Sequence, residues 1–146
     1  MFYVVGVKMQ QTSNQHRISF YEQVGGAEGV NKLVNTFCDL LETTEEGRPV
    51  FLLHLRGHGM DHARIEQFNF FSGFFGGPRL YAEKWGHSNV REIHAHVEID
   101  EIASQAWLTC MSMAMDKLAY SQTLKQQLMQ NFTDMAGLLQ QQSKQA

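Results

Sequence analysis

Apolar side chains that recur every three or four residues constrain the fold of this chain more than any other feature of its sequence. Such spacing gathers apolar groups on one face of an α-helix, whereas a half-buried strand alternates apolar and polar residues. The clearest example predicts a helix over residues 27–42, after the flexible sequence VGGA at 24–27. Its apolar face consists of Val30, Leu33, Val34, Phe37, Leu40 and Leu41.

The same spacing predicts three further helices. The segment DHARIEQFNFFSGFF, residues 61–75, has helical spacing and ends at the sequence GGP, where a glycine stop is followed by proline. Asp100 is a suitable N-cap for a helix that carries Trp107. The last helix, residues 124–139, is expected to fray into a polar tail at 143–146.

Other segments give weaker signals. One glycine and a proline near the start, Gly47 and Pro49, and two glycines near the end, Gly57 and Gly59, predict an irregular connection over residues 43–60, because these residues interrupt helices. Residues 89–95 are predicted to form one or two helical turns. Residues 1–18 are predicted to be a short or mobile N-terminal extension. With no convincing two-residue alternation and no internal repeat, the sequence predicts an all-α fold.

Length and composition exclude several classes of protein. A chain of 146 residues, 43% of them hydrophobic, can bury one domain's core. The net charge of -3 argues against a nucleic-acid partner. No apolar run is long enough for a membrane span or a signal peptide, and two cysteines are typical of a reducing compartment, so we expect a cytoplasmic protein.

The chain has seven histidines, whose imidazoles can bind a metal ion. His54, His58 and His62 are four residues apart, but glycines interrupt that helix, so we interpret them as a solvated polar segment. His94 and His96 are two residues apart and point in different directions on a helix, so at most one faces a common site. The spacing alone does not decide which.

Cysteine and phenylalanine residues allow two interpretations each. Cys38 and Cys110 lie on apolar helix faces, where a small buried hydrophobic group is the ordinary role and a nucleophile needs a nearby base. The five phenylalanines within residues 68–75 are typical of a protein core, and they are also suited to line a cavity for a large flat ligand.

Three separated pieces of the sequence resemble one family. The pieces FYEQVGGAEGVNKLVNTF at 20–37, FFGGPRLYAEKWGH at 74–87 and HAHVEIDEIASQAWLTCM at 94–111 are together similar to truncated haemoglobins of group II. The resemblance covers about residues 19–140 and implies a globin domain over 19–142. It implies a two-over-two helical sandwich around haem b.

The resemblance also assigns roles to individual residues. The histidine thirteen residues before the tryptophan is the proximal iron ligand of the family, which is His94 here, and His96 has no such role. Trp107 and Gln67 are implied as donors to a ligand on the distal side of the haem. The implied distal pocket consists of Cys38, Phe51, Ala63, Phe70 and Phe71.

This sequence departs from the family pattern around the haem. Family members usually carry tyrosine where Cys38 stands, and often another where Phe51 stands, so donation to a bound ligand falls mainly to Trp107 and Gln67. Ile93 replaces an arginine that often pairs with a haem propionate. The remaining candidates for propionate contact are Arg79, Tyr81, His87 and Arg91.

The sequence leaves three hypotheses about function. The first is a haem protein that binds dioxygen, nitric oxide or carbon monoxide, with nitric oxide dioxygenase or peroxidase chemistry and an unidentified reductase as open questions. The second is a six-coordinate electron-transfer or sensor haem protein, closed by one of His54, His58 and His62 or by Cys38 as thiolate. The third is a haem-free helical module. The oligomeric state is expected to be monomer or homodimer.

Overall fold

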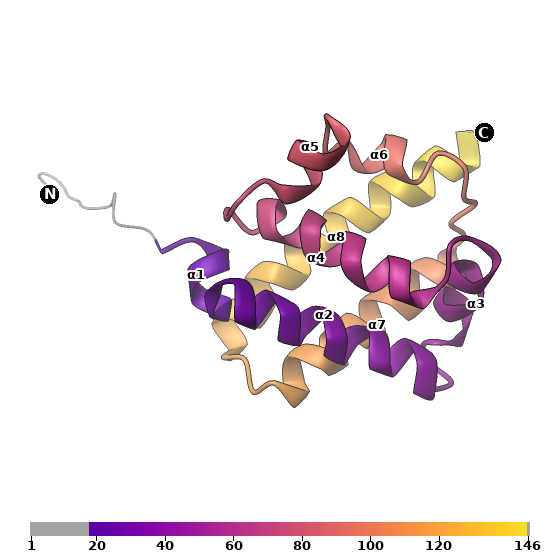
Figure 1. Ribbon diagram of the computed structural model, residues 1–146. Coiled ribbons are helices and arrows are strands. Elements are labelled where there is room, and N and C mark those ends of the chain that lie inside the picture. Colours follow the sequence, from indigo (N-terminus) through magenta and orange to yellow (C-terminus); the bar gives the residue numbers. More distant parts are fainter. Residues whose placement is uncertain (1–17, 146) are drawn as a thin grey trace, which may run out of the picture.

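The computed structural model describes residues 18–145, and every regular element in that range is an α-helix (Figure 1). The all-α prediction is confirmed. Of the predicted N-terminal extension, residues 1–17 lie outside the described residues. The helices are α1 Phe20–Val24, α2 Gly26–Thr43, α3 Arg48–Arg56, α4 Met60–Phe74, α5 Leu80–Trp85, α6 Val90–Ile93, α7 Glu101–Lys117 and α8 Gln122–Gln145.

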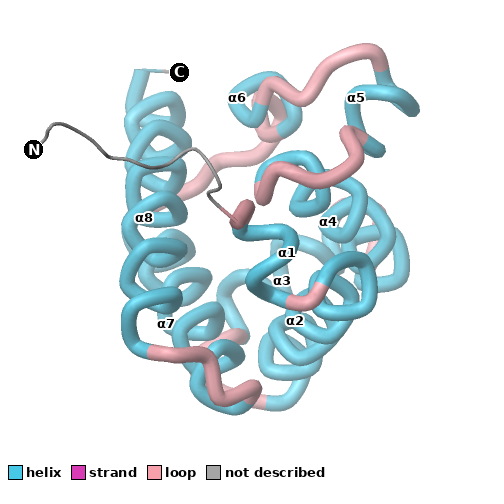
Figure 2. Tube along the Cα trace, turned by 90° about the vertical axis from the view of Figure 1, so that its left-hand side faces the viewer, coloured by secondary structure: helices cyan, strands magenta, loops and turns pink. Residues whose placement is uncertain are grey.

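Four long helices form two packed layers. Helices α2 and α4 contact each other in one layer, α7 and α8 contact each other in the second, and α2 packs across onto α7. Figure 2 views the layers from the side, with α7 and α8 to the left of α2 and α4. The short helices α5 and α6 lie together at one end. The largest fully buried side chains between the layers include Phe37, Phe71, Phe75, Phe132, Leu33, Leu41, Met111 and Met115.

The helices predicted from apolar spacing are present. Helix α2 covers the predicted 27–42, and its predicted apolar face is buried. Asp100 caps α7, since its carboxylate accepts a hydrogen bond from the Ala103 N–H at 2.8 Å. Helix α4 ends at Phe74, just before the two glycines. Helix α6 forms one turn, where one or two turns were expected within 89–95.

The predicted irregular connection at 43–60 is wrong, because α3 occupies nine of its residues. The glycines lie at the two ends of this helix rather than inside it, with Gly47 at the N-cap and Gly57 at the C-cap. Pro49 lies in the first turn, where its missing N–H removes no intrahelical hydrogen bond. The breaking signals therefore mark helix boundaries. Helix α5, within a segment interpreted as a loop, was also not predicted.

The C-terminal helix is longer than predicted. Helix α8 continues through the glutamines to Gln145, into the segment expected to be a polar tail. Glutamine is a good helix former, so a polar end does not by itself stop a helix. Two side chains near this end, Gln142 and Ser143, hydrogen-bond to residues far away in the sequence.

Gly29 allows α1 and α2 to pack closely. A Cβ atom on Gly29 would lie 1.8 Å from the carbonyl oxygen of Val24, a backbone atom that cannot move aside freely. At the GGP sequence, a Cβ atom on Gly77 would lie 2.3 Å from the ring of Tyr21. At both positions the neighbouring atoms leave no space for a Cβ atom, so glycine is needed there for close packing and not only for the conformation of a turn.

Replacement of Gly29 by alanine is expected to lower the free energy of unfolding by about 1–3 kcal/mol, because helix α1 must shift to admit the methyl group. Gly137 is the matched control: it lies in α8, and nothing lies within 4 Å of its added Cβ. Gly137→Ala should stabilise by about 0.5–1 kcal/mol through lower backbone entropy. Urea unfolding measures both, and equal effects of the two changes would contradict the close approach.

Within residues 18–145, no helix is both long enough and apolar enough to cross a membrane.

Candidate functional site

His94 lies at the end of helix α6, and one of its ring nitrogens already has a hydrogen-bond partner. Its Nδ1 lies 2.9 Å from the carbonyl oxygen of Val90, one turn earlier, so Nδ1 carries the proton and donates it there. The Nε2 lone pair is then free for a metal ion, and the bond to Val90 fixes the ring plane. The side chain is half-buried, and this burial lowers the pKa of His94. The hydrogen bond to Val90 acts in the opposite direction but is the smaller effect. The imidazole is therefore neutral at pH 7, as a ligand must be.

His96 lies two residues further and is exposed. A metal ion inside the domain therefore has access to His94 and not to His96. The sequence spacing did not decide between the two histidines. The family resemblance selects His94, and the ring of His94 is the more buried of the two.

Trp107 on α7 packs among three aromatic rings. Its ring centroid lies 5.1 Å from those of Phe37 and Phe132 and 6.3 Å from that of Phe71. None of these side chains has an acceptor for the indole N–H. The ring is half-buried rather than sealed in the core. It is held firmly by packing while its one donor remains available.

Cys38 and Gln67 face each other between α2 and α4. The Cys38 thiol donates to the Gln67 side-chain oxygen, with 3.9 Å between sulfur and oxygen. This bond leaves the amide NH2 group of Gln67 as a donor to other partners. Burial raises the pKa of Cys38 to about 12, so the thiol stays protonated at neutral pH. A protonated thiol is neither a strong nucleophile nor a ready iron ligand.

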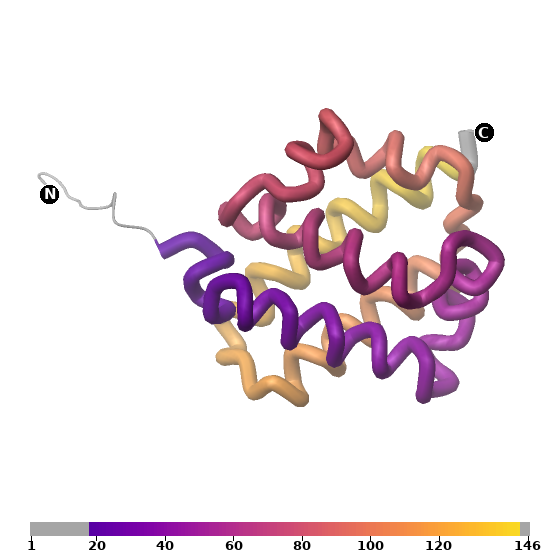
Figure 3. Tube along the Cα trace, in the orientation of Figure 1, coloured from indigo at the N-terminus to yellow at the C-terminus, as the bar shows by residue number. Residues whose placement is uncertain are grey.

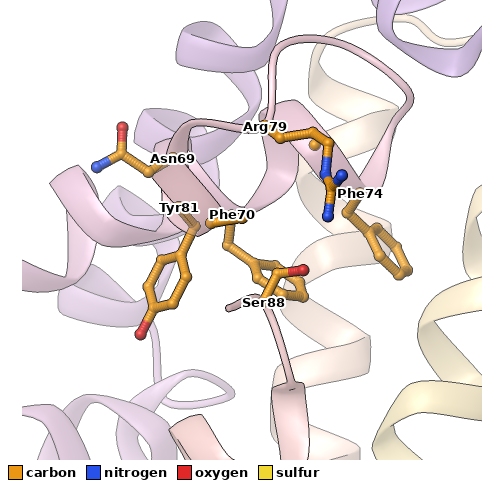
Figure 4. A pocket seen from close by; sticks show the side chains of 8 residues that line it. Asn69, Phe70, Phe74, Arg79, Tyr81 and Ser88 are labelled. Carbon is orange, nitrogen blue, oxygen red and sulfur yellow. The ribbon is translucent and has the colours of Figure 1, made fainter. Parts of the chain in front are cut away.

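A small cavity opens where α4 meets α5 (Figure 4). Phe70 and Phe74 from α4 lie with their rings 5.6 Å apart, and Tyr81 from α5 meets Phe70 edge-on at 6.1 Å. Arg79, which is exposed, also lines this cavity. Aromatic walls with a guanidinium at the edge are suited to a flat apolar ligand that carries carboxylates. The remaining lining residues are Asn69, Gly73, Ala82 and Ser88.

A family model of bacterial-like globins matches residues 19–141 of this chain. The chain is a bacterial-like globin. Globins hold haem iron and bind small gaseous ligands, so the cavity and the histidine belong to a protein of that general function.

Relatives place this globin in group II of the truncated haemoglobins. It is 35% identical over 96 residues to group 2 truncated hemoglobin YjbI of Bacillus subtilis, covering 66% of this chain and 68% of that one. The structure is similar to the cold-adapted truncated hemoglobin of Pseudoalteromonas haloplanktis TAC125, with a TM-score of 0.78, 31% identity and coverage of 84% and 97%. It is also similar to the group II 2-on-2 hemoglobin of Agrobacterium tumefaciens, with a TM-score of 0.79, 25% identity and coverage of 88% and 98%. The predicted two-over-two fold is confirmed.

The residues of this globin fit a haem group. Two places among residues 18–145 offer the groups that such a cofactor needs. His94 at the end of α6 has a free Nε2, and the cavity between α4 and α5 has phenylalanine and tyrosine rings with Arg79 at its edge.

The other predicted pocket residues lie in different surroundings. Phe51 on α3 is half-buried against the core. Ala63 is buried, one turn of α4 before Gln67. Phe71 is 2% exposed, stacks on Phe75 and packs at a tilt against Phe132, so it belongs to the core between the layers more than to an open pocket.

Two of the four candidates for propionate contact lie away from the cavity lining. His87 is half-buried, its ring 6.3 Å from that of Tyr81, and its Nδ1 accepts a hydrogen bond from the Asn89 N–H. Arg91 is exposed on α6, and its carbonyl oxygen is bonded to Gln142 of α8. Arg79 and Tyr81 are therefore the candidates that the cavity brings together.

The three histidines at 54, 58 and 62 do not share one helix face. His58 and His62 are exposed on either side of Gly59, with ring centroids 4.7 Å apart. His54 on α3 is half-buried, and its pKa is lowered first by burial and then by the nearby imidazoles of His94 and His62. Of the three, His54 alone has its ring inside the domain.

Two polar clusters near the site were not predicted from the sequence. Arg64 on α4 donates to Asn35 Oδ1 at 2.9 Å and Asp39 Oδ1 at 2.8 Å on α2, and also to Glu42. It thus ties together the two helices that carry Cys38 and Gln67. Polar side chains at three- or four-residue spacing, as at 35, 39 and 42, were the available signal, since they share one helix face.

The second cluster holds α5 against α4. Glu66 accepts hydrogen bonds from Lys84 and Asn69, at 2.9 and 3.0 Å, and from the indole N–H of Trp85. Although burial opposes it, the pKa of Glu66 is lowered by these three bonds, so the carboxylate stays charged. The cluster fixes α5, and with it Tyr81, over the cavity. No pattern in the sequence indicated this cluster, because α5 itself was not predicted.

Proposed function

We propose that this globin binds haem b through His94 as the proximal iron ligand and holds dioxygen or a related diatomic molecule on the distal side, next to Trp107. The observation that carries the proposal is the bond between His94 Nδ1 and the Val90 carbonyl, which leaves Nε2 free and orients it. Ferrous haem supplies an open coordination position for the diatomic ligand.

The side chains determine how long such a ligand stays bound. The Trp107 N–H and the Gln67 amide are the strong donors, whereas the Cys38 thiol donates weakly and already donates to Gln67. A hydrogen bond to a strongly polarised oxygen atom contributes about 1.5–3 kcal/mol, which corresponds to about ten- to a hundredfold in the dissociation rate. Ligand release therefore depends mainly on Trp107 and Gln67.

Turnover is a second part of the proposal. Oxidation of nitric oxide to nitrate by dioxygen requires one electron for each nitrate formed, and an unidentified reductase supplies it. This reaction requires a pocket that holds dioxygen and excludes water, and the phenylalanines provide such apolar surroundings. Peroxide reduction needs a distal acid or base, and Cys38, with a pKa raised to about 12 by burial, is a poor one. Nitric oxide oxidation is thus the better candidate.

One observation favours a second candidate function, six-coordinate haem for electron transfer or sensing. The half-buried His54 imidazole lies close enough to that of His94 for the His94 ring, after burial, to help lower the pKa of His54. His58 and His62 are exposed, and Cys38 stays protonated, so His54 is the internal ligand that the described residues favour.

Absorption spectra of the ferric, ferrous and carbonmonoxy forms separate the candidates. A five-coordinate high-spin ferrous spectrum, with a Soret band that shifts on addition of carbon monoxide, is expected for the first. A six-coordinate ferrous spectrum that becomes five-coordinate in His54→Ala, but not in His58→Ala or His62→Ala, would favour the second. Absence of any shifting Soret band after reconstitution with haem would leave only a haem-free helical module.

The partners in this proposal are dioxygen, nitric oxide and carbon monoxide, with no nucleic acid. Both cysteines are free and buried, as expected of a protein in the reducing cytoplasm. We propose that the protein is a monomer or a homodimer.

A further inference from the structure

We propose that Gln142 and Ser143, near the C-terminal end of α8, are positioning residues that hold the chain segment carrying His94 and thereby set the strength of its bond to iron. This inference rests on the proposed role of His94 as the proximal ligand. It assigns a function to the glutamine-rich end of the chain.

Two hydrogen bonds join α8 to this segment on both sides of His94. The Gln142 amide donates to the carbonyl oxygen of Arg91 at 2.9 Å, three residues before the histidine. The Ile99 N–H donates to the Ser143 hydroxyl at 2.8 Å, five residues after it. The partners are 51 and 44 residues apart in the sequence. Figure 3 shows the C-terminal end of α8 beside the segment that follows α6.

The segment has little else to hold it. Helix α6 has only four residues, and a helix of one turn is not stable by itself. Residues 94–99 form turns and irregular chain. Within the described chain, every other hydrogen bond of residues 89–99 runs to a residue within five positions, including the Asn89 cap and the Val90 bond to His94. The two bonds from α8 are therefore the hydrogen bonds that tie this segment to the rest of the described domain.

The Gln142 bond acts directly on the geometry of the proximal histidine. Val90 and Arg91 supply consecutive carbonyl groups: the first accepts from the His94 ring and the second from Gln142. Because these carbonyls share one peptide segment, fixing the second restricts the direction of the first. The orientation of the ring, and its distance from a bound metal ion, then depend on α8.

The test uses the full chain with and without haem. Gln142→Glu keeps the size of the side chain but removes the NH2 donor, and Ser143→Ala removes the hydroxyl, whereas Ser143→Thr restores it. Gln141→Ala is the matched control, since Gln141 is exposed on the same turn of α8. Amide hydrogen exchange of the apoprotein reports on the segment without haem. The iron–histidine stretching band of the ferrous haem form and the rate of haem loss report on His94.

In Gln142→Glu and Ser143→Ala, exchange over residues 90–99 should accelerate, the iron–histidine band should shift or broaden, and haem loss should become about three- to tenfold faster. Gln141→Ala and Ser143→Thr should resemble the wild type. Unchanged exchange at Ile99 in Ser143→Ala, or faster exchange with an unchanged iron–histidine band, would overturn the inference alone. A wild type without an iron–histidine band would overturn the proposed function, and this inference with it.

Discussion

Replacement of His94 by alanine should weaken haem binding by more than about a hundredfold and remove the proximal bond, since even groups that only orient a metal ligand contribute about ten- to a hundredfold to affinity. The half-buried imidazole is anchored through Nδ1 to Val90 and has Nε2 free. His96 cannot take its place at the end of α6, because its side chain is exposed. The rate of haem transfer to an acceptor globin, measured by the Soret band, gives the size of the effect.

His96→Ala is the control for this prediction. It removes an imidazole two residues away and should leave the proximal bond and the rate of haem loss unchanged. His94→Gly gives a second control, since added imidazole should occupy the space left by the side chain and restore the spectrum. If His96→Ala abolished ligation and His94→Ala did not, the assignment of the ligand would be wrong by two residues.

Apolar periodicity predicted the long helices because their burial follows the same rule as their spacing. The predicted apolar face of α2 is buried, and Asp100 caps α7 as expected. The rule failed at α3, where glycine and proline mark the ends of a helix, because a breaking residue gives no information about which side of a boundary it occupies. It failed again at α5, which is six residues long and too short to show a period.

The candidate site was predictable only in part. The spacing of His94 and His96 limits a metal site to one of them, and the family resemblance selects His94, whose ring the structure buries. The contacts that hold the site were not predictable, because they join residues far apart in the chain: Cys38 with Gln67, 29 positions apart, and Gln142 with Arg91, 51 apart. Single-sequence patterns report on local periods, whereas such pairs are set by the packing of whole helices.

Replacement of Trp107 by phenylalanine should accelerate dioxygen dissociation by about ten- to a hundredfold, because it removes the indole N–H that we propose as a donor to the bound ligand. The phenylalanine ring keeps the aromatic contacts with Phe37 and Phe132, so the core should remain packed. Carbon monoxide acquires less negative charge when bound, and its dissociation should change much less. Stopped-flow and flash-photolysis measurements give both rates.

Trp85, the other tryptophan of the chain, provides the matched control. Its indole N–H donates to Glu66 on the outside of α5, and its side chain is exposed, so Trp85→Phe should leave dioxygen dissociation unchanged. Equal rates in the two variants would remove Trp107 as the distal donor. The amide of Gln67 would then be the remaining strong donor, since the neighbouring thiol of Cys38 is weak and already donates to it.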